Sequence, residues 1–144
     1  EQDRILVGMD LKKDIKQLIA AYNDSKGVTA KFNKNLLNRI NATLGANFDV
    51  ESFEHLSIWN EAEGRIEMHL RSCKDQVVEV PSLNMKIPFK AGESIHTENC
   101  HKYSQDDIEE TAARSGFKVK KQWFDTQHRF SLNLFGPEEL TSHA

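Results

Sequence analysis

The sequence has few of the features that mark specialised classes of protein. Its 144 residues include only two cysteines, Cys73 and Cys100, which are too few and too far apart to imply a disulfide framework. No apolar run approaches the length of a membrane span, and no secretory signal peptide is visible. A net charge of −3 argues against a protein that binds phosphate backbones, which needs a basic face. We therefore expect no membrane or nucleic-acid partner, and a cytoplasmic location.

The remaining composition is that of an ordinary globular chain. Charged residues make up 28% and hydrophobic residues 38% of the sequence. The length suffices for one domain with a real core. We find no internal repeat and no low-complexity tract, so the order of predicted elements has to indicate the fold.

The first segment, RILVGMDL, is a short continuous apolar run. Such a run predicts a strand buried on both faces, as in a parallel α/β sheet. Parallel neighbours need crossover connections, and few candidates follow. Since the chain also starts at Glu1, one interpretation is that it begins within a fold whose upstream residues complete the sheet. The alternative is an edge strand of a self-contained α+β domain, and both remain open.

Periodicity predicts the later elements. Apolar residues at helical spacing indicate helices over residues 14–22 and 28–44, the second ending at Gly45. Strict alternation over 53–60 and 65–72 predicts an antiparallel hairpin. Two shorter extended segments follow, then a helix capped by Ser104 and a terminal hairpin. We predict an α/β fold (α+β for the chain alone), divided as follows: 1–48, last parallel strand and helices of a core; 49–100, antiparallel insertion; 101–136, final helix and terminal hairpin of the core; 137–144, flexible tail.

The stretch ESIHTENCHKY, residues 93–103, is rich in reactive side chains. His96, Cys100 and His101 could ligate zinc, with Glu98 or His69 as a fourth ligand. Their spacing fits no common structural zinc pattern, so we predict no metal site. Cys100 and His101 are neighbours on a predicted strand and point to opposite faces, which disfavours a nucleophile with its base.

A third interpretation of this stretch is a polar pocket. If residues 94–100 are extended, His96, Glu98 and Cys100 share one face. A carboxylate there could hold an N–H-bearing ring by a charge-assisted hydrogen bond, and a small polar residue two positions on could add a second contact. The alternative is that Glu98 is an ordinary solvated surface charge.

Four longer segments together resemble the histidine-specific S-adenosylmethionine (SAM)-dependent methyltransferases, whose best-known member makes Nα-trimethylhistidine for ergothioneine biosynthesis. The segments are DRILVGMDLKKD, AAYNDSKGVTAKFNKNLLNRIN, FEHLSIWNEAEGRIEMHLRS and GESIHTENCHKY. The resemblance implies a class I, Rossmann-like methyltransferase with a substrate domain, SAM as co-substrate and a histidine-like amino acid as methyl acceptor. It covers about Arg4 to Phe135 and only the C-terminal half of the family pattern. The family's glycine-rich cofactor loop, ribose-binding carboxylate and substrate-holding Asn lie upstream, so we expect the chain alone to be inactive.

The resemblance carries over to four residues. Tyr22 matches a tyrosine that contacts the backbone end of the substrate, and Met68 matches a methionine lining the imidazole pocket. Glu98 matches the glutamate that hydrogen-bonds the imidazole. Cys100 stands where the best-studied member has a serine, and a thiol is a weaker and larger hydrogen-bonding group. A different amino acid or amine is therefore a possible substrate.

The family resemblance suggests no catalytic residue or general base in this chain. An alternative function is a non-catalytic module that binds an amino acid or a peptide end in a methyltransferase-like pocket. A further alternative is a degenerate structural partner of a separate cofactor-binding chain.

Overall fold

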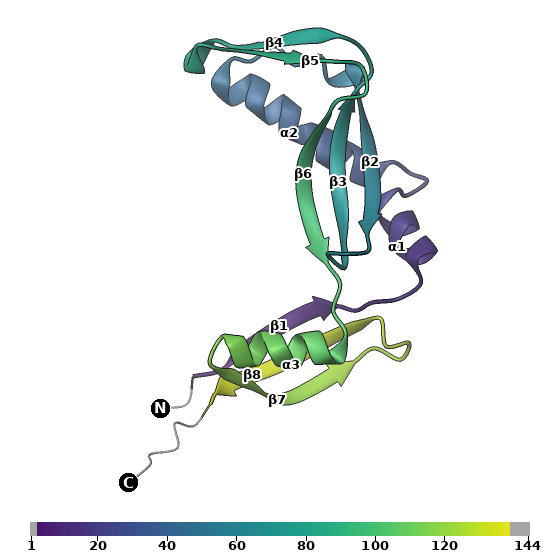
Figure 1. The fold of residues 1–144 in the computed structure, drawn as a ribbon, viewed down its shortest axis with the longest axis vertical. Helices are drawn as coiled ribbons and strands as arrows, with labels where there is room; N and C mark the ends of the chain where they lie inside the picture. Colours follow the sequence, from purple (N-terminus) through teal and green to yellow (C-terminus); the bar gives the residue numbers. More distant parts are fainter. Residues whose placement is uncertain (1–2, 139–144) are drawn as a thin grey trace. The chain divides into compact units, whose positions relative to one another are not determined.

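A computed structural model describes residues 3–138 (Figure 1). The chain divides into two compact units, and each is described by itself. Unit 1 combines residues 3–14 with residues 101–138, so it joins the two ends of the described chain. Unit 2 is the continuous segment Ile15–Cys100.

Unit 1 is a three-stranded antiparallel sheet with one helix packed against it (Figure 1). Its elements are β1 (Ile5–Asp10), α3 (Gln105–Arg114), β7 (Phe117–Phe124) and β8 (Phe130–Pro137). The strand order is β1-β8-β7, so the last strand lies between the first strand and its own hairpin partner. Ile108 and Ala112 of α3 are buried against Met9, Leu11 and Phe135. This small core joins the first segment of the chain to the last.

The start of α3 agrees with the prediction from sequence. The Ser104 hydroxyl accepts a hydrogen bond from the Asp107 backbone N–H at 3.1 Å, and the Asp107 carboxylate accepts one from the Ser104 N–H at 2.7 Å. This reciprocal capping box satisfies two backbone donors that a helix start leaves without partners. Hydrogen bonds from Lys12 and from the Ser104 N–H lower the pKa of Asp107 to about 2.

β1 differs from the strand that its apolar run predicted. It pairs with β8 in antiparallel register, from Ile5 opposite Phe135 to Asp10 opposite Phe130. Within the described residues no parallel strand lies beside it, and Ile5 and Leu6 are 44% and 60% exposed. Burial of β1 on both faces is therefore not formed by the described residues, because α3 covers only one face. Both interpretations of this strand remain open: a sheet completed by upstream residues, or an edge strand of a self-contained domain.

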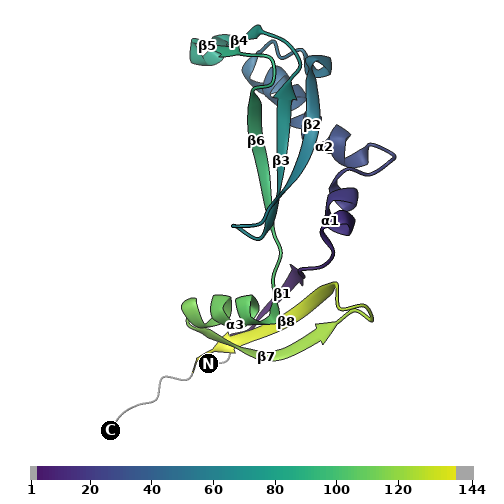
Figure 2. The same cartoon turned by 45° about the vertical axis from the view of Figure 1, so that its right-hand side comes forward.

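Unit 2 is a second three-stranded sheet with two helices and a two-stranded ribbon. Its helices are α1 (Ile15–Tyr22) and α2 (Val28–Leu44), with two short 3-10 turns at Val50–Ser52 and Pro81–Leu83. Its strands are β2 (Phe53–Asn60), β3 (Arg65–Ser72), β4 (Gln76–Val80), β5 (Met85–Phe89) and β6 (Ser94–His101). The sheet order is β2-β3-β6, and β4 pairs only with β5 (Figure 2). The β2–β3 hairpin lies where alternation predicted it.

The core of unit 2 is an aromatic cluster between α2 and the strands. Phe53 packs edge-on against Phe89 with ring centroids 5.4 Å apart, and against Phe48 at 5.8 Å. Leu37 of α2 and Leu70 of β3 complete the buried centre. Edge-to-face rings add specific attraction to the burial of apolar area, so this cluster fixes α2 on the sheet.

The C-terminal end of α2 lies where its sequence signal predicted, and Asp24 holds the other end. The Asp24 carboxylate accepts hydrogen bonds from the N–H groups of Val28 and Thr29, which lower the pKa of Asp24 to about 2. Gly45 ends the helix with φ 65°, a conformation that favours glycine.

The apolar stripe of α2 does not coincide with its buried residues. Phe32 and Leu36 are 65% and 42% exposed, whereas Asn33 and Leu37 are fully buried. The helix therefore buries the polar side-chain amide of Asn33 inside unit 2. This amide is part of the site described below.

The two helices group differently from the expected boundary at residue 48. Both α1 and α2 contact β2 and β3, and both belong to unit 2. The structure thus places them with the antiparallel strands and not with β1. Among the described residues, no helix combines the length and apolarity needed to cross a membrane.

Candidate functional site

The β2-β3-β6 sheet has two faces of different character. Opposite pairs such as His55 with Leu70 and Ser57 with Met68 share the face that carries α1 and α2. The intervening residues, among them Glu67 and His69 of β3, lie on the other side because side chains alternate along a strand. We call this second side the open face.

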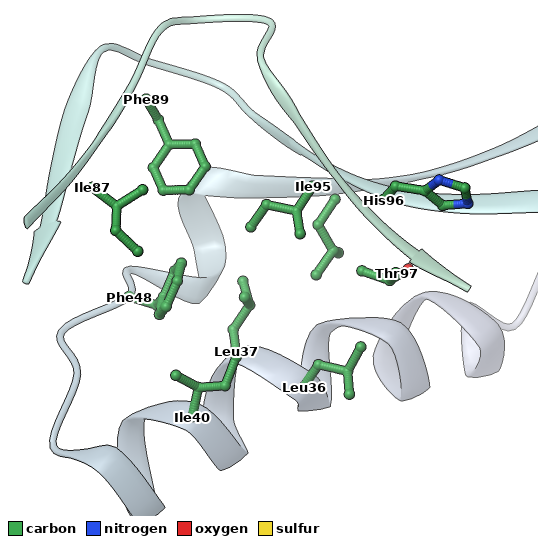
Figure 3. Close-up of a pocket in the computed structure, with 10 residues that line it drawn as sticks. Leu36, Leu37, Ile40, Phe48, Ile87, Phe89, Ile95, His96 and Thr97 are labelled. Atoms are coloured by element: carbon green, nitrogen blue, oxygen red, sulfur yellow. The ribbon is translucent and has the colours of Figure 1, made fainter. Parts of the chain in front are cut away.

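Strand β6 continues the open face beside β3. The imidazole of His96 stacks on that of His69 with centroids 4.5 Å apart, so His96 lies on the open face. Figure 3 shows the His96 ring on the side of β6 away from α2, while Thr97 points toward the helix. Because β6 runs unbroken from Ser94 to His101, Glu98 and Cys100 follow His96 on the same face.

The four substrate-binding residues predicted from the resemblance are therefore divided. Glu98, which is exposed, and Cys100, which is half-buried, share the open face two positions apart. Met68 is 3% exposed and lies on the helix-covered face. Tyr22 is the last residue of α1 and is half-buried. The structure brings Glu98 and Cys100 onto one surface and does not bring Met68 there.

A buried polar network anchors the end of α1. The side-chain amide nitrogen of Asn33 donates to the backbone oxygen of His69 at 3.1 Å, and the same nitrogen lies 2.9 Å from His55 Nδ1. Since this nitrogen is a donor, His55 Nδ1 must accept, which places the ring proton on Nε2. Nε2 lies 2.8 Å from the backbone oxygen of Tyr22 and donates to it. His55 thus connects α2 to the terminal residue of α1.

Sequence reasoning did not find His55 or Asn33 as functional candidates. Alternation along residues 53–60 puts His55 on the same face as Phe53, but nothing in the sequence indicates which residue His55 contacts. Asn33 is a polar residue in a helix, which is usually solvent-exposed. One feature of the sequence could have indicated the burial of Asn33: it lies four residues before Leu37, on the same side of α2.

Several side chains on the open face hold the carboxylate of Glu67 in place. Its carboxylate accepts hydrogen bonds from Asn60 Nδ2 and Arg65 Nε, both at 2.9 Å, and from His69 at 3.3 Å. These donors, chiefly Asn60 and then Arg65, lower the pKa of Glu67 to about 2. A fixed negative charge therefore lies one strand away from the strand that carries Glu98.

An apolar pocket of about 390 Å³ opens between α2 and the strands (Figure 3). Leu36, Leu37 and Ile40 of α2 form one wall, and Ile95 of β6 faces them. None of Tyr22, Met68, Glu98 or Cys100 is among the described residues that line it. The pocket is thus separate from the predicted substrate contacts.

Comparisons with known proteins agree with the resemblance. The family described as histidine-specific, SAM-dependent methyltransferase matches residues 1–137. Proteins named histidine N-alpha-methyltransferase are 41% identical in Mycolicibacterium smegmatis and 42% identical in Mycobacterium tuberculosis, each over 132 residues and 92% of this chain. Ergothioneine biosynthesis protein 1 of Schizosaccharomyces pombe is 28% identical over 125 residues, covering 86% of this chain and 16% of its own length. The chain spans only 41% of the length of the two mycobacterial proteins. With nearly every residue covered by the family match, the chain belongs to the histidine-specific, SAM-dependent methyltransferase family.

Proposed function

We propose that this chain is the C-terminal, substrate-binding portion of an enzyme that methylates the α-amine of histidine with SAM. The observation that carries the proposal is the 41–42% identity to two proteins named histidine N-alpha-methyltransferase, over 92% of the chain. The strand order β1-β8-β7 supports a Rossmann-like parent fold, since many class I methyltransferase sheets finish with a helix and a terminal antiparallel pair.

In this proposal the open face of β6 receives the imidazole of the substrate. Glu98 accepts a hydrogen bond from a ring N–H, and the Cys100 thiol approaches the ring from the next position on the same face. A carboxylate acceptor makes a stronger bond than a neutral group, so Glu98 sets the preference for an N–H-bearing ring. Cys100 contributes less to binding because a thiol is a weak donor and acceptor.

The backbone end of the substrate is assigned to Tyr22. Its carbonyl is held by His55 Nε2, so the last turn of α1 is tied to the sheet rather than left to fray. Tyr22 ends α1 on the helix-covered side of the sheet, whereas Glu98 lies on the open face, so one substrate reaches both only around an edge of the sheet. In this proposal Tyr22 contacts the amino-acid end of such a substrate, and His55 acts on binding only by positioning Tyr22.

Met68 shapes the pocket from beneath the sheet. Its side chain is buried on the helix-covered face, and its backbone oxygen accepts a hydrogen bond from the Thr97 hydroxyl at 2.9 Å. That bond ties β3 to β6 directly beside Glu98. The contribution of Met68 to imidazole binding is therefore indirect, through the packing that supports the binding strand.

We assign the binding of SAM mainly to residues outside this chain. The seven glycines are each at least 18 positions from the next, so none forms a glycine-rich cofactor loop. SAM supplies an electrophilic methyl group to the reaction. The task left to this chain is orientation, since holding the neutral amine close to and in line with the methyl group supplies much of the rate.

The competing proposal is a binding module without chemistry, for which the same open face would suffice. We would incubate the full-length protein with SAM and a mixture of amino acids and analyse the products by mass spectrometry. Methylated histidine supports the proposal. A different methylated amino acid would retain the methyltransferase and replace histidine as substrate. A folded protein that binds histidine but methylates nothing would establish the binding module.

A further inference from the structure

We propose that Glu67, His69 and His96 form a binding site for a divalent transition metal on the open face of the sheet. One ligand atom from each of the three residues lies within 4.8 Å of the other two. Two imidazoles and one carboxylate form a donor set that suits Zn²⁺, Co²⁺ and Ni²⁺. We base this site on the geometry of these three residues and not on the proposed methyl transfer.

The carboxylate of Glu67 is held in place for such a role. Its Oε1 accepts bonds from Asn60 Nδ2 at 2.9 Å and from Arg65 Nη2 at 2.8 Å, whereas its Oε2 faces His69 Nε2 at 3.3 Å. The first two contacts orient the group through one oxygen and leave the second directed toward the imidazoles. Outer partners of this kind commonly fix the ligands of metal sites.

The two imidazoles come from adjacent strands, so the sheet itself sets their spacing. His69 on β3 has a side chain that is 15% exposed, and His96 on β6 is exposed. Their rings stack at 4.5 Å with planes 20° apart. A metal bonded at roughly 2.0–2.2 Å to each ligand needs donor atoms within about 4 Å of one another. Rotation of the exposed His96 ring supplies the small adjustment without movement of the backbone.

Three protein ligands would leave the metal with at least one open coordination position, which water or a small external ligand would fill. The guanidinium of Arg65, paired with Glu67, opposes the charge of the metal and moderates its affinity. The alternative is that Glu67 and His69 form only a hydrogen bond, and His69 and His96 only a ring stack. This alternative predicts no saturable binding of a metal ion.

Titration of the metal-free full-length protein with Co²⁺ tests the proposal, because bound Co²⁺ gives ligand-field absorption in visible light. We expect one saturable equivalent, displaced by Zn²⁺, without the charge-transfer band that thiolate ligands would add. His69→Gln and His96→Gln should each weaken binding at least about tenfold. His128→Asn is the control: His128 lies in the β7–β8 turn at φ 50°, which Asn tolerates, and binding should be unchanged.

His96 is exposed, so His96→Gln should keep the fold, as circular dichroism would verify. Three results would overturn the proposal: no saturable Co²⁺ binding, parent-like affinity in a folded His96→Gln protein, or a thiolate band that disappears on substitution of Cys73 or Cys100. None of these results bears on whether the protein methylates histidine.

Discussion

Two substitutions of His55 separate the two hydrogen bonds that this residue makes. The side-chain amide of Asn can occupy the place of Nδ1, so His55→Asn keeps the contact with Asn33 and loses the one with Tyr22. The longer Gln side chain can place its amide nitrogen near Nε2, so His55→Gln keeps the donor to the Tyr22 carbonyl. If His55 positions Tyr22 for substrate binding, the two variants should differ in affinity for histidine.

The expected size of the difference follows from a single hydrogen bond. A neutral bond such as the 2.8 Å contact to Tyr22 contributes a net ~0.5–1.5 kcal/mol. If this free energy passes fully into substrate binding, the KM for histidine rises roughly two- to tenfold in His55→Asn. In His55→Gln the KM stays near that of the parent protein. Since each variant removes one bond of the pair, their losses of folding stability should be similar, about 1 kcal/mol each.

The assay is steady-state methylation by the full-length protein at saturating SAM, with urea unfolding of the same preparations to measure stability. Equal KM values in the two variants, with comparable stability, would refute the positioning role of His55. A selective rise of KM in His55→Gln would also refute it, because that variant preserves the bond to Tyr22.

Three further substitutions test the remaining assignments. Glu98→Ala should lower kcat/KM for histidine roughly 10- to 150-fold, because a hydrogen bond to a charged group contributes about 1.5–3 kcal/mol. It should also relax selectivity toward bulkier apolar rings, and parent-like values of both would show that Glu98 does not contact the substrate. Cys100→Ser should retain or improve histidine use, and complete loss of activity would instead indicate a role specific to the thiol. Asp10→Asn should cost about 1.5–3 kcal/mol in urea unfolding, because it replaces the charge-assisted contact of Asp10 with the buried Lys102 ammonium, 3.0 Å away, by a neutral one. Burial raises the pKa of Asp10, but hydrogen bonds from Lys13 and Lys102 hold that pKa below its ordinary value. The stabilisation is therefore present above about pH 4 and is lost as the pH falls through the folded-state pKa. The Asn variant should lose less stability over that acid range, and equal acid sensitivity would contradict the ion-pair assignment.

The local elements of this fold could be predicted because their signals are local. The structure confirms α2 over Val28–Leu44, the N-cap at Ser104 and the alternating strands of the β2–β3 hairpin. A helix cap, a turn or a repeat of apolar residues depends on residues that are close together in the sequence. It can therefore be recognised without knowledge of the tertiary fold.

The partners of each element were not predictable in the same way. The apolar run of β1 is compatible with several sheet environments, and only the position of β8 shows that its pairing here is antiparallel. The buried side of α2 is centred on Asn33, although Phe32 and Leu36 are more apolar and have the same helical spacing. Burial at Asn33 depends on His55 and on the backbone of His69, which lie 22 and 36 residues away.

In the candidate site, too, features set by local pattern were predictable and contacts between distant residues were not. Alternation alone predicted that Glu98 and Cys100 share a face, and the strand that the structure forms there has the required length. Met68 was paired with them by resemblance, yet its strand position places it on the opposite face of the sheet. The juxtaposition of His69 with His96 depends on the pairing of two strands joined through a 21-residue excursion, Cys73–Glu93, which no local pattern specifies.

The most direct test of the proposed function is the position of the transferred methyl group. The full-length protein would be incubated with histidine and SAM carrying a deuterated methyl group, and the product fragmented by mass spectrometry. Label on the α-nitrogen is the predicted result, with the imidazole held by Glu98 and unmodified. Label on an imidazole nitrogen, or a folded protein that transfers no label to histidine, would contradict it.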